Sequence, residues 1–326
     1  MASRIMYERM SLVERTGIRA RVSSGGPEAT VAQVDPELFT LRPWYHDFSA
    51  LGFDTSFLDE PLTLGERVRR AGELVRAVLE RAWGRARTGP VPRERVRSAR
   101  EVLRRLPSSH MLNQPVKERY LLALVKQALA GLGPAPTCLE LFSADGYYSC
   151  RLKTLSAGAR VTGVELDSGQ VQRAETIARR MGLREVSFRR EDVRSFLERS
   201  GETYDLVLCA GGLYHLSDPI GLLRAVSRVT RGYLVVQSVV TLETDDPGYF
   251  VQPAKGWQHG CRFTHAWLRA RLEMLGWQIL DEARAELPGN HRAHDRGASF
   301  FLCRVFATPS DFLQSPLQIP EPSEPS

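Results

Sequence analysis

The sequence has few of the residues on which several classes of protein depend. Its five cysteines form no Cys-x-x-Cys pair, which argues against the common zinc and disulfide frameworks and favours reduced, buried thiols. No apolar run approaches the length of about 20 residues that a membrane-spanning helix needs. The first nine residues carry charges where a signal peptide is apolar. We therefore expect a cytoplasmic protein with no membrane contact.

Lysine is also scarce. Only four of the 44 basic residues are lysines, so the net charge of +6 depends on arginine. Thirteen arginines lie between Arg67 and Arg105, and a run of this kind is usually the solvated face of helices. The alternative is a stripe that grips RNA phosphates. We favour the solvated face and keep an RNA partner as the alternative.

The composition of the chain divides it into four segments. A chain of 326 residues that is 43% hydrophobic can build a large core. Residues 1–36 mix Arg, Gly, Ser and Thr without periodicity and predict a partly ordered arm, and residues 37–115 predict an aromatic and helical cap. Residues 116–308 alternate apolar runs with helical patterns. Residues 309–326, rich in Pro, Ser and Glu, predict a disordered tail.

The cap segment has two parts. Trp44-Tyr45-His46 lies in an aromatic stretch that is either a loop covering the core or a lid whose His46 faces a substrate. Residues 64–87 repeat apolar positions at helical spacing, and residues 93–106 predict a second helix that Pro107 ends. Residues 110–115 predict a connector, and 116–132 a helix that leads into the core segment.

The core segment predicts an α/β fold: a Rossmann-like, doubly wound, mostly parallel sheet with an antiparallel last strand, preceded by the N-terminal helical cap. The expected strands are 137–142, 160–165, 185–189, 204–209, 232–239, 277–283 and 299–307. The expected helix starts are Ser168, Asp218 and Thr264, and the expected helix ends are Gly182, Gly232 and Gly276.

Acidic residues accompany the first three of these strands. Glu140 lies near the end of the first, Glu165 ends the second, and Asp192 follows the third. Ligands of open α/β sheets bind at the carboxyl ends of the strands, and an acid after the second strand accepts hydrogen bonds from ribose hydroxyls. Each acid could instead cap a helix or join a surface salt bridge. The pattern therefore favours a ligand that contains a nucleoside.

The loop after the first strand lacks a dinucleotide fingerprint. That fingerprint is Gly-x-Gly-x-x-Gly, and only Gly146 fits it. Phe142 and Ala144 stand where further glycines would be expected. We therefore expect that the loop cannot use a positive-φ geometry at these two residues. The ring of Phe142 would crowd a ligand unless it turns into the core.

Four short motifs follow one another along the core segment. They are Glu140-Leu-Phe142-Ser-Ala144-Asp-Gly146, Val164-Glu165-Leu-Asp167, Arg190-Glu191-Asp192-Val193 and Tyr204-Asp205-Leu-Val-Leu-Cys-Ala-Gly-Gly-Leu-Tyr-His215. In this order and spacing they resemble the motifs of class I S-adenosylmethionine-dependent methyltransferases. The resemblance covers about residues 116–307.

The resemblance implies S-adenosylmethionine as the methyl donor and a role for each matching residue. Those expected to bind the donor are Glu140, Ala144, Gly146, Glu165, Asp192, Val193, Ala210 and Tyr214. The first three would border the methionine moiety, and Glu165 would hold the ribose hydroxyls. Asp192 and the backbone of Val193 would bind the adenine amino group. The stretch from Ala210 to Tyr214 would lie beneath the sulfonium.

Two further elements look like one branch of this superfamily. They are Trp44-Tyr45-His46 with Gly52 and Thr55, and Gly212-Leu-Tyr214-His215. The branch includes the tRNA wobble-uridine carboxymethyl-transferring enzymes and related uncharacterised bacterial methyltransferases. Its carboxylated donor needs basic partners from the N-terminal region, and residues 93–117 offer no matching lysine motif. Ordinary S-adenosylmethionine is therefore the expected donor.

Methyl transfer to oxygen or nitrogen requires alignment of the acceptor and removal of a proton. The candidate bases are His215, His46 and His259. His215 could equally be a structural residue bonded to backbone. His291 and His294 have no cysteine or acid at reliable ligand spacing, so no metal site is expected.

The sequence thus predicts a methyltransferase that acts on a small-molecule acceptor by O- or N-methylation. The aromatic segment 241–261 is expected to line the acceptor pocket. One alternative is a tRNA-modifying methyl- or carboxymethyltransferase whose 67–105 helices grip phosphates. The other is a non-catalytic S-adenosylmethionine-binding protein. The oligomeric state is not predicted.

Overall fold

A computed structural model describes residues 36–55, 108–290 and 292–305. The arm expected over residues 1–36, except its last residue, lies outside the described residues. So do the two helices expected within residues 64–106 and the expected tail, 309–326.

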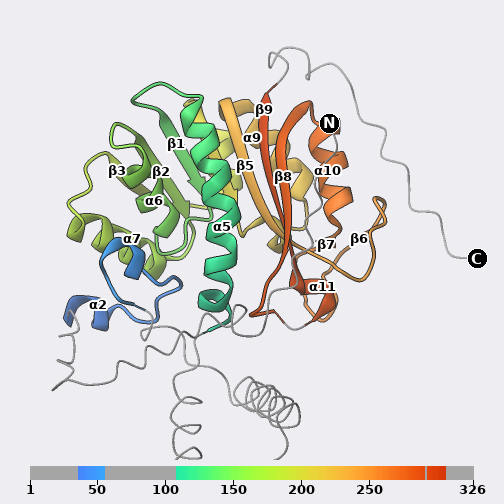
Figure 1. Ribbon diagram of the computed structural model, residues 1–326, viewed down its shortest axis with the longest axis horizontal. Helices are drawn as coiled ribbons and strands as arrows, with labels where there is room; N and C mark the ends of the chain where they lie inside the picture. Colours follow the sequence, from blue (N-terminus) through green and yellow to red (C-terminus); the bar gives the residue numbers. More distant parts are fainter. Residues whose placement is uncertain (1–35, 56–107, 291, 306–326) are drawn as a thin grey trace, which may run out of the picture.

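A seven-stranded sheet in the order β3-β2-β1-β4-β5-β9-β8 forms the centre of the molecule (Figure 1). Its strands are β1 Thr137–Leu141, β2 Arg160–Glu165, β3 Val186–Arg190, β4 Tyr204–Ala210, β5 Thr230–Val240, β8 Trp277–Glu286 and β9 Gly297–Val305. The five strands from β3 to β5 are parallel, and β9 runs antiparallel to both β5 and β8. The predicted fold class is therefore confirmed.

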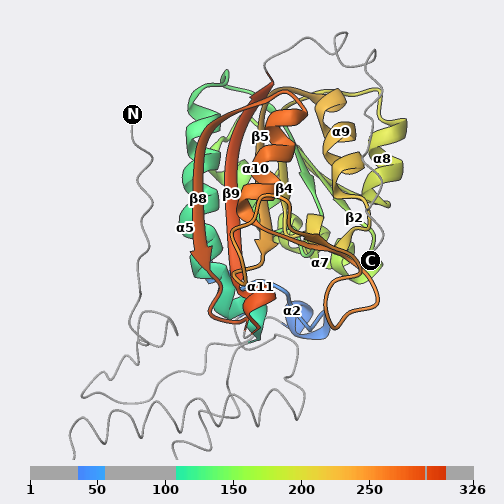
Figure 2. The ribbon, with the colours of Figure 1, turned by 90° about the vertical axis from the view of Figure 1, so that its right-hand side faces the viewer.

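Helices cover both faces of the sheet (Figure 2). On one face lie α5 Ser109–Ala130, α6 Tyr147–Leu155 and α7 Ser168–Arg180, with the short α2 Pro36–Thr40 and η1 Ser49–Leu51 of the cap. On the other lie α8 Val193–Arg199, α9 Pro219–Val229 and α10 His265–Met274. Fully buried side chains such as Leu121 and Phe300 join the first group of helices to the sheet, and each contributes about 1.5–3 kcal/mol through burial.

Helix α5 begins earlier than the sequence predicts. The expected connector, 110–115, is helical because Ser108 caps the helix: its side chain accepts a hydrogen bond from the backbone N–H of Met111, at 3.3 Å. Pro115 lies in the second turn, where it removes one backbone hydrogen bond without ending the helix. As a result His110 and Lys117 lie two turns apart on one helix face.

The caps of three other helices test the predicted starts and ends. Asp218 and Thr264 cap α9 and α10 as predicted. The prediction for α7 is wrong by one residue, because the carboxylate of Asp167 accepts from the N–H of Gln170 and begins the helix. Gly232 does not end α9 but lies inside β5, where a Cβ would come within 2.5 Å of the carbonyl oxygen of Asp205.

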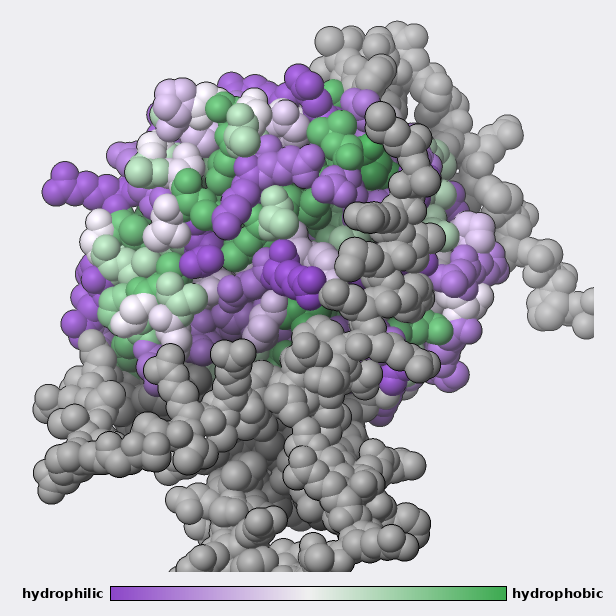
Figure 3. All heavy atoms as spheres, in the orientation of Figure 1, coloured by the Kyte–Doolittle hydropathy of each residue, from purple (hydrophilic) through white to green (hydrophobic). Residues whose placement is uncertain are grey.

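Two smaller elements lie beside the carboxyl ends of the parallel strands. A two-stranded antiparallel sheet joins β6 Phe250–Val251 to β7 Arg262–Phe263, and α11 Ala293–Arg296 precedes β9. The face of the molecule with α5 carries hydrophilic and hydrophobic side chains interspersed (Figure 3). In the part of the chain that the structure describes, no helix combines the length and the apolar character needed to span a bilayer.

Candidate functional site

The candidate site lies at the carboxyl edge of the parallel strands. Strand order reverses at β1, whose neighbours are β2 on one side and β4 on the other. In open α/β sheets the crevice at such a point binds the ligand. The cap residues 36–55 and the N-terminal end of α5 lie at this edge (Figure 1). The segments that follow β1, β2, β3 and β4 therefore face a common region.

The loop after β1 adopts the left-handed conformation that its sequence argued against. Phe142 has φ 60°, Ala144 has φ 46° and Gly146 has φ 78°, so the prediction for the first two residues is wrong. Non-glycine residues in this region cost about 1–2 kcal/mol each. Hydrogen bonds from the loop to β2 offset that cost: the N–H of Ser143 donates to the carbonyl of Val164, and the N–H of Ala144 to the carboxylate of Glu165, both at 3.0 Å.

Phe142 turns toward the core on the side of α8 and α9. Its ring lies against the backbone of Gly212, the second residue after β4, where a Cβ would come within 2.0 Å of Phe142 Cδ2. A glycine at 212 therefore makes room for the aromatic ring at 142. The ring takes the orientation that keeps it from crowding a ligand over the loop.

The carboxylate of Glu165 links the ends of β1 and β2. Oε2 accepts from the N–H of Ala144 at 3.0 Å, and Oε1 accepts from the N–H groups of Leu166 and Asp167 at 2.8 and 2.9 Å. Each carboxylate oxygen can accept about two hydrogen bonds, so Oε2 keeps capacity for a ligand hydroxyl. Leu166 beside it is 63% exposed and offers an apolar surface to a base.

Asp192 and Val193 follow β3. Oδ1 of Asp192 caps α8 by accepting from the N–H groups of Arg194 and Ser195 at 3.1 and 3.0 Å. Among the described residues no group donates to Oδ2 of Asp192. Val193 is buried in the first turn of α8. Asp192 therefore caps a helix, which was the alternative role considered for each acid. Its Oδ2, which accepts from no described residue, can still bind a ligand.

Glu140 lies buried on the face of β1 toward α5 and α6. Its exposed fraction is 2%, and Ser149 Oγ donates a hydrogen bond to its carboxylate. Burial raises the pKa of Glu140 to about 8. The side chain is therefore mainly protonated near neutral pH, and a positive charge placed beside it would favour the ionised form.

His46 is bonded to the loop after β1. Asp145, which is fully buried, accepts from the N–H groups of Tyr45 and His46 at 2.8 and 2.7 Å, and its other oxygen lies 2.5 Å from His46 Nδ1. The imidazole also stacks on Tyr147 at a centroid distance of 5.1 Å. This arrangement anchors the cap on the loop, and Trp44 is buried with it.

The 3-10 helix η2, Leu213–His215, follows β4 and carries Tyr214 and His215. The carbonyl of Tyr214 accepts from Cys261 N at 3.0 Å and from Arg262 Nη1 at 3.3 Å. The rings of Tyr214 and His215 are tilted against each other with their centroids 4.1 Å apart, and burial raises the pKa of Tyr214 to about 12. Desolvation, followed by the charges of Arg262 and Lys117, lowers the pKa of His215. The imidazole is therefore mainly neutral at neutral pH.

His259 is separate from the other predicted histidines. It lies between β6 and β7 with an exposed side chain. In the described part of the chain, no hydrogen bond, ion pair or ring contact joins it to His46 or His215. The structure thus brings Tyr214 and His215 together at the edge, with His46 in the cap contact and His259 in an exposed loop.

Sequence reasoning missed two residues of α5 at this edge. The ring of His110 lies tilted against that of Tyr45 at a centroid distance of 4.0 Å, and burial lowers the pKa of His110 to about 3. Lys117 is only 7% exposed, and burial lowers its pKa to about 8. Their signal in the sequence is the spacing of seven residues, which places both on one helix face. The sequence predicts a connector over 110–115, so the helical spacing of His110 and Lys117 becomes visible only with the helix of the structure.

Gln237 is a further polar residue of the site that sequence reasoning missed. It lies in β5 beside Ala210 of β4, and its backbone carbonyl accepts from the N–H of Gly211 at 3.1 Å. Its side chain is 1% exposed, and within the described ranges Nε2 has no hydrogen-bond partner. A buried amide donor without a partner normally costs stability. A polar ligand at this edge would accept the hydrogen bond of Nε2. The residues of the edge therefore fit a ligand with hydroxyl, amino and carboxylate groups.

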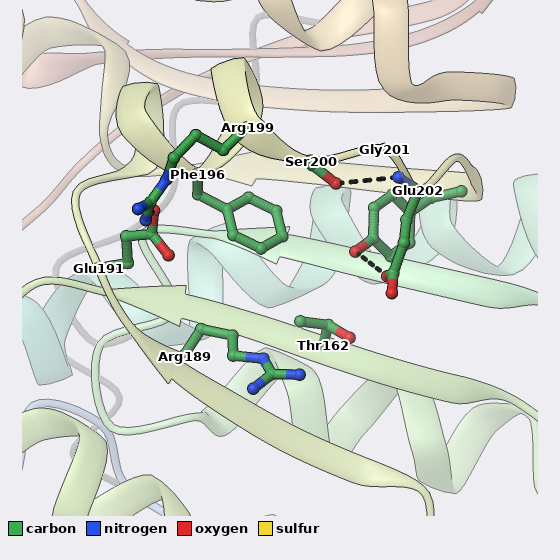
Figure 4. A pocket seen from close by; sticks show the side chains of 9 residues that line it. Thr162, Arg189, Glu191, Phe196, Arg199, Ser200, Gly201 and Glu202 are labelled. Carbon is green, nitrogen blue, oxygen red and sulfur yellow. Dashed lines mark hydrogen bonds and ion pairs between the residues drawn. The ribbon is translucent and has the colours of Figure 1, made fainter.

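A recess of about 480 Å³ lies elsewhere, between α8 and the surfaces of β2 and β3 (Figure 4). Its lining includes Thr162, Arg189 and Phe196. It exists because α8 is short and leaves part of these strands uncovered. None of the predicted site residues lines it, so the chemistry is assigned to the carboxyl edge. Within the described residues, no cluster of three or more His, Cys, Asp or Glu side chains could hold a metal ion.

Known proteins resemble the core segment. The family model described as "Methyltransferase domain" matches residues 133–280. Ubiquinone biosynthesis O-methyltransferase of Paracidovorax citrulli (strain AAC00-1) is 30% identical over 74 residues, which are 23% of this chain and 31% of that protein. The chain thus spans less than a third of that curated relative's length.

Solved structures resemble the same region. The N-terminal domain of EvdMO1, in a crystal structure in the presence of SAH and D-fucose, is 25% identical with a TM-score of 0.42, over 56% of this chain and 82% of that chain. A SAM dependent methyltransferase from Aquifex aeolicus is 16% identical with a TM-score of 0.42, over 60% and 95% of the two chains. The family match coincides with the parallel strands and their edge. Residues 133–280 are therefore similar to a methyltransferase domain.

Proposed function

We propose that this protein transfers a methyl group from S-adenosylmethionine to an oxygen or nitrogen atom of a small molecule. The observation that carries the proposal is the position of Glu165. Its carboxylate joins the ends of β1 and β2 through the N–H of Ala144 and retains capacity for ribose hydroxyls. The family match over the same residues supports this donor.

The adenosine end of the donor is assigned to the segments after β2 and β3. Glu165 would hold the ribose, with Leu166 against the base. Asp192, through its free Oδ2, and the backbone of Val193 would bind the adenine amino group. Glu165 ends a parallel strand, and the other residues follow one, at the same edge.

The methionine end is assigned to the loop after β1. Ala144 and Gly146 would border it, with Glu140 behind them. The ammonium group of the donor would favour ionisation of Glu140, whose buried carboxyl accepts a hydrogen bond from Ser149. The stretch from Ala210 to Tyr214 would lie beneath the sulfonium.

When bound, S-adenosylmethionine supplies an electrophilic methyl group on sulfur. The residues of this chain then have to hold the acceptor in line and take up its proton. His215 is the candidate base best supported by the structure, because its pKa is lowered and it lies beside Tyr214. His46 already uses Nδ1 to contact Asp145, and His259 is exposed between β6 and β7.

A small-molecule acceptor is favoured over RNA for two reasons. The curated relative is named an O-methyltransferase of ubiquinone biosynthesis, and the segment from 241 to 261 adjoins η2 through the bond between Cys261 and Tyr214. The arginine-rich segment 67–105 lies outside the described residues. tRNA is tested directly: affinity that falls steeply with salt would replace the small-molecule proposal.

The decisive test of donor binding is calorimetry with S-adenosylhomocysteine. Glu165→Ala should weaken binding by about 1.5–3 kcal/mol, because a charged hydrogen-bond acceptor is lost. The matched control is Glu175→Ala, an exposed acid on α7, which should leave affinity unchanged. Equal affinities of wild type and Glu165→Ala would mean that the ribose binds elsewhere. Absence of turnover with every phenol, amine and carboxylic acid offered would favour the non-catalytic alternative.

A further inference from the structure

The four lysines of the chain differ in what their ammonium groups contact. Lys153 Nζ donates to the carbonyls of Ala157 and Ala159 at 2.7 and 2.8 Å. Lys255 lies 3.7 Å from Glu243, and Lys126 is exposed to water on the outer face of α5. Lys117 differs from all three. It is 7% exposed. No described residue accepts a hydrogen bond from its ammonium group or forms an ion pair with it.

The groups around Lys117 do not neutralise its charge. Its electrostatic neighbours are His110 and His215, whose pKa values it helps to lower. Three nearby carboxyl groups already have other partners: Asp145 contacts His46, Glu165 accepts from backbone N–H groups, and Glu140 accepts from Ser149. A buried ammonium without a partner is destabilising. Lys117 therefore has a binding capacity that the described residues leave unused.

The geometry of α5 directs Lys117 to the candidate site. Side chains in a helix lean toward its N-terminus, and the N-terminus of α5 lies at the carboxyl edge (Figure 1). His110, in the first turn of α5, contacts Tyr45 there. Gln237 is a second buried donor without a partner for its Nε2. It projects from the face of β5 that packs against α5, between Val235 and Val239. Two unpartnered donors on facing elements match a ligand with acceptor oxygens.

We propose that Lys117 binds a carboxylate group of a ligand at the carboxyl edge, with Gln237 as a second donor. The identity of the ligand rests on the proposed function. The carboxylate has two sources, the amino-acid end of the methyl donor and an acidic acceptor. Both would place a negative charge next to Lys117 and complete its missing ion pair.

The test uses the full-length protein labelled with carbon-13 and nitrogen-15 in lysine, followed by nuclear magnetic resonance. Only four side-chain signals arise, so the pKa of each lysine can be measured. A bound carboxylate should raise the pKa of Lys117 by at least about one unit, because an opposite charge favours the ionised form. The signal of Lys126, on the same helix, is the internal control and should not move.

Matched ligands separate the two sources. S-Adenosylhomocysteine carries the carboxylate, and its decarboxylated analogue keeps the amine without it. A rise in the pKa of Lys117 with the first and not the second assigns the carboxylate of the donor. A rise with benzoate but not benzamide, in protein saturated with S-adenosylhomocysteine, assigns an acidic acceptor. No rise with either carboxylate would overturn the proposal.

Variants separate this proposal from the assignment of the donor site. In Lys117→Met, the ratio of the affinities for S-adenosylhomocysteine and its decarboxylated analogue should fall at least tenfold. In Lys126→Met this ratio should stay as in the wild type. Binding of 5′-methylthioadenosine, which has no amino-acid part, should survive in Lys117→Met and shows that the variant is folded. If neither adenosine ligand binds the wild type, the proposed function fails, and the benzoate and benzamide titrations of the unliganded protein still decide the role of Lys117.

Discussion

The ring of Phe142 and the backbone of Gly212 occupy complementary space: a Cβ at 212 would come within 2.0 Å of the ring. The loop after β1 and the loop after β4 are thus fitted to each other. Gly212 has φ −109°, a conformation open to any residue. Its lack of a side chain is therefore required by the contact with the ring and not by the backbone.

Gly212→Ala should destabilise the protein by about 1–3 kcal/mol, because the added methyl group forces the ring of Phe142 out of its place. The measurement is urea unfolding. Gly133→Ala is the matched control, since a Cβ at Gly133 meets open space. In a double-mutant cycle, Phe142→Ala should remove most of the cost of Gly212→Ala. Additive costs would contradict the steric explanation.

Asp145→Ala should cost about 3–5 kcal/mol of unfolding free energy, because it leaves the buried His46 and two backbone N–H groups without their acceptor. The control is Asp167→Ala, which removes an exposed helix cap and should cost about 1 kcal/mol. Unfolding in urea, followed by tryptophan fluorescence, compares the two. If Asp145→Ala cost no more than Asp167→Ala, residues 36–55 would dock on the loop after β1 without the Asp145 carboxylate.

Glu140 should make stability fall as the pH rises through neutrality. Its pKa is about 8 in the folded chain, against 4.5 without burial. Between these values the folded state holds one more proton than the unfolded state, so the contribution is complete below pH 4.5 and lost above about pH 8. The loss should be on the order of a few kcal/mol. Glu140→Gln should remove this slope, and exposed Glu175→Gln should not. Identical pH profiles for wild type and Glu140→Gln would exclude the raised pKa.

Lys117→Met should stabilise the unliganded protein by about 1–3 kcal/mol at pH 7, because an unpaired ammonium is replaced by an apolar chain of similar length. The pKa of Lys117 is about 8 when folded and 10.5 without burial, so wild-type stability should also rise with pH between those values. Lys126→Met, at an exposed position, should change stability by less than about 0.5 kcal/mol. A destabilised Lys117→Met would point to a structural role.

His215→Gln should lower kcat by at least about tenfold if the imidazole takes up the acceptor proton. Because the pKa of His215 is lowered, wild-type kcat/KM should fall only below about pH 6.5, as the imidazole becomes protonated. The variant should lose that acidic limb while binding S-adenosylhomocysteine normally. His259→Gln, in the exposed loop, is the comparison. An unchanged acidic limb in His215→Gln would assign the proton to another group.

The sequence predicted the sheet and its edge because both depend on local patterns. Apolar runs that end near an acid, as at Glu165, are visible over a few residues, and helix caps such as Asp218 are visible over four. The predicted antiparallel end of the sheet followed from the short connection between two apolar runs, and it is present in β8 and β9.

The remaining features depend on residues far apart in the chain. Nothing near Ala144 shows that its N–H bonds to Glu165, 21 residues later, and holds a positive φ. The pairing of His46 with Asp145 spans 99 residues. Lys117 was missed for a different reason: Pro115 was interpreted as part of a connector, although the cap at Ser108 carries the helix through it. Tertiary contacts overrode local preference in the first two cases, and in the third the helix begins at the Ser108 cap, before the proline.

The carboxylate of Asp145 has a consequence for how this kind of protein can diversify. It belongs to the loop after β1, yet its hydrogen-bond partners are Tyr45 and His46 of the cap. A cap exchanged with a relative, by recombination or in the laboratory, would meet a buried charge selected for a different partner. A change of residue 46 alone would remove the side-chain partner of Asp145 and leave its two backbone partners. The segment that carries Tyr45 and His46 and the loop after β1 are thus fitted to each other through one buried carboxylate.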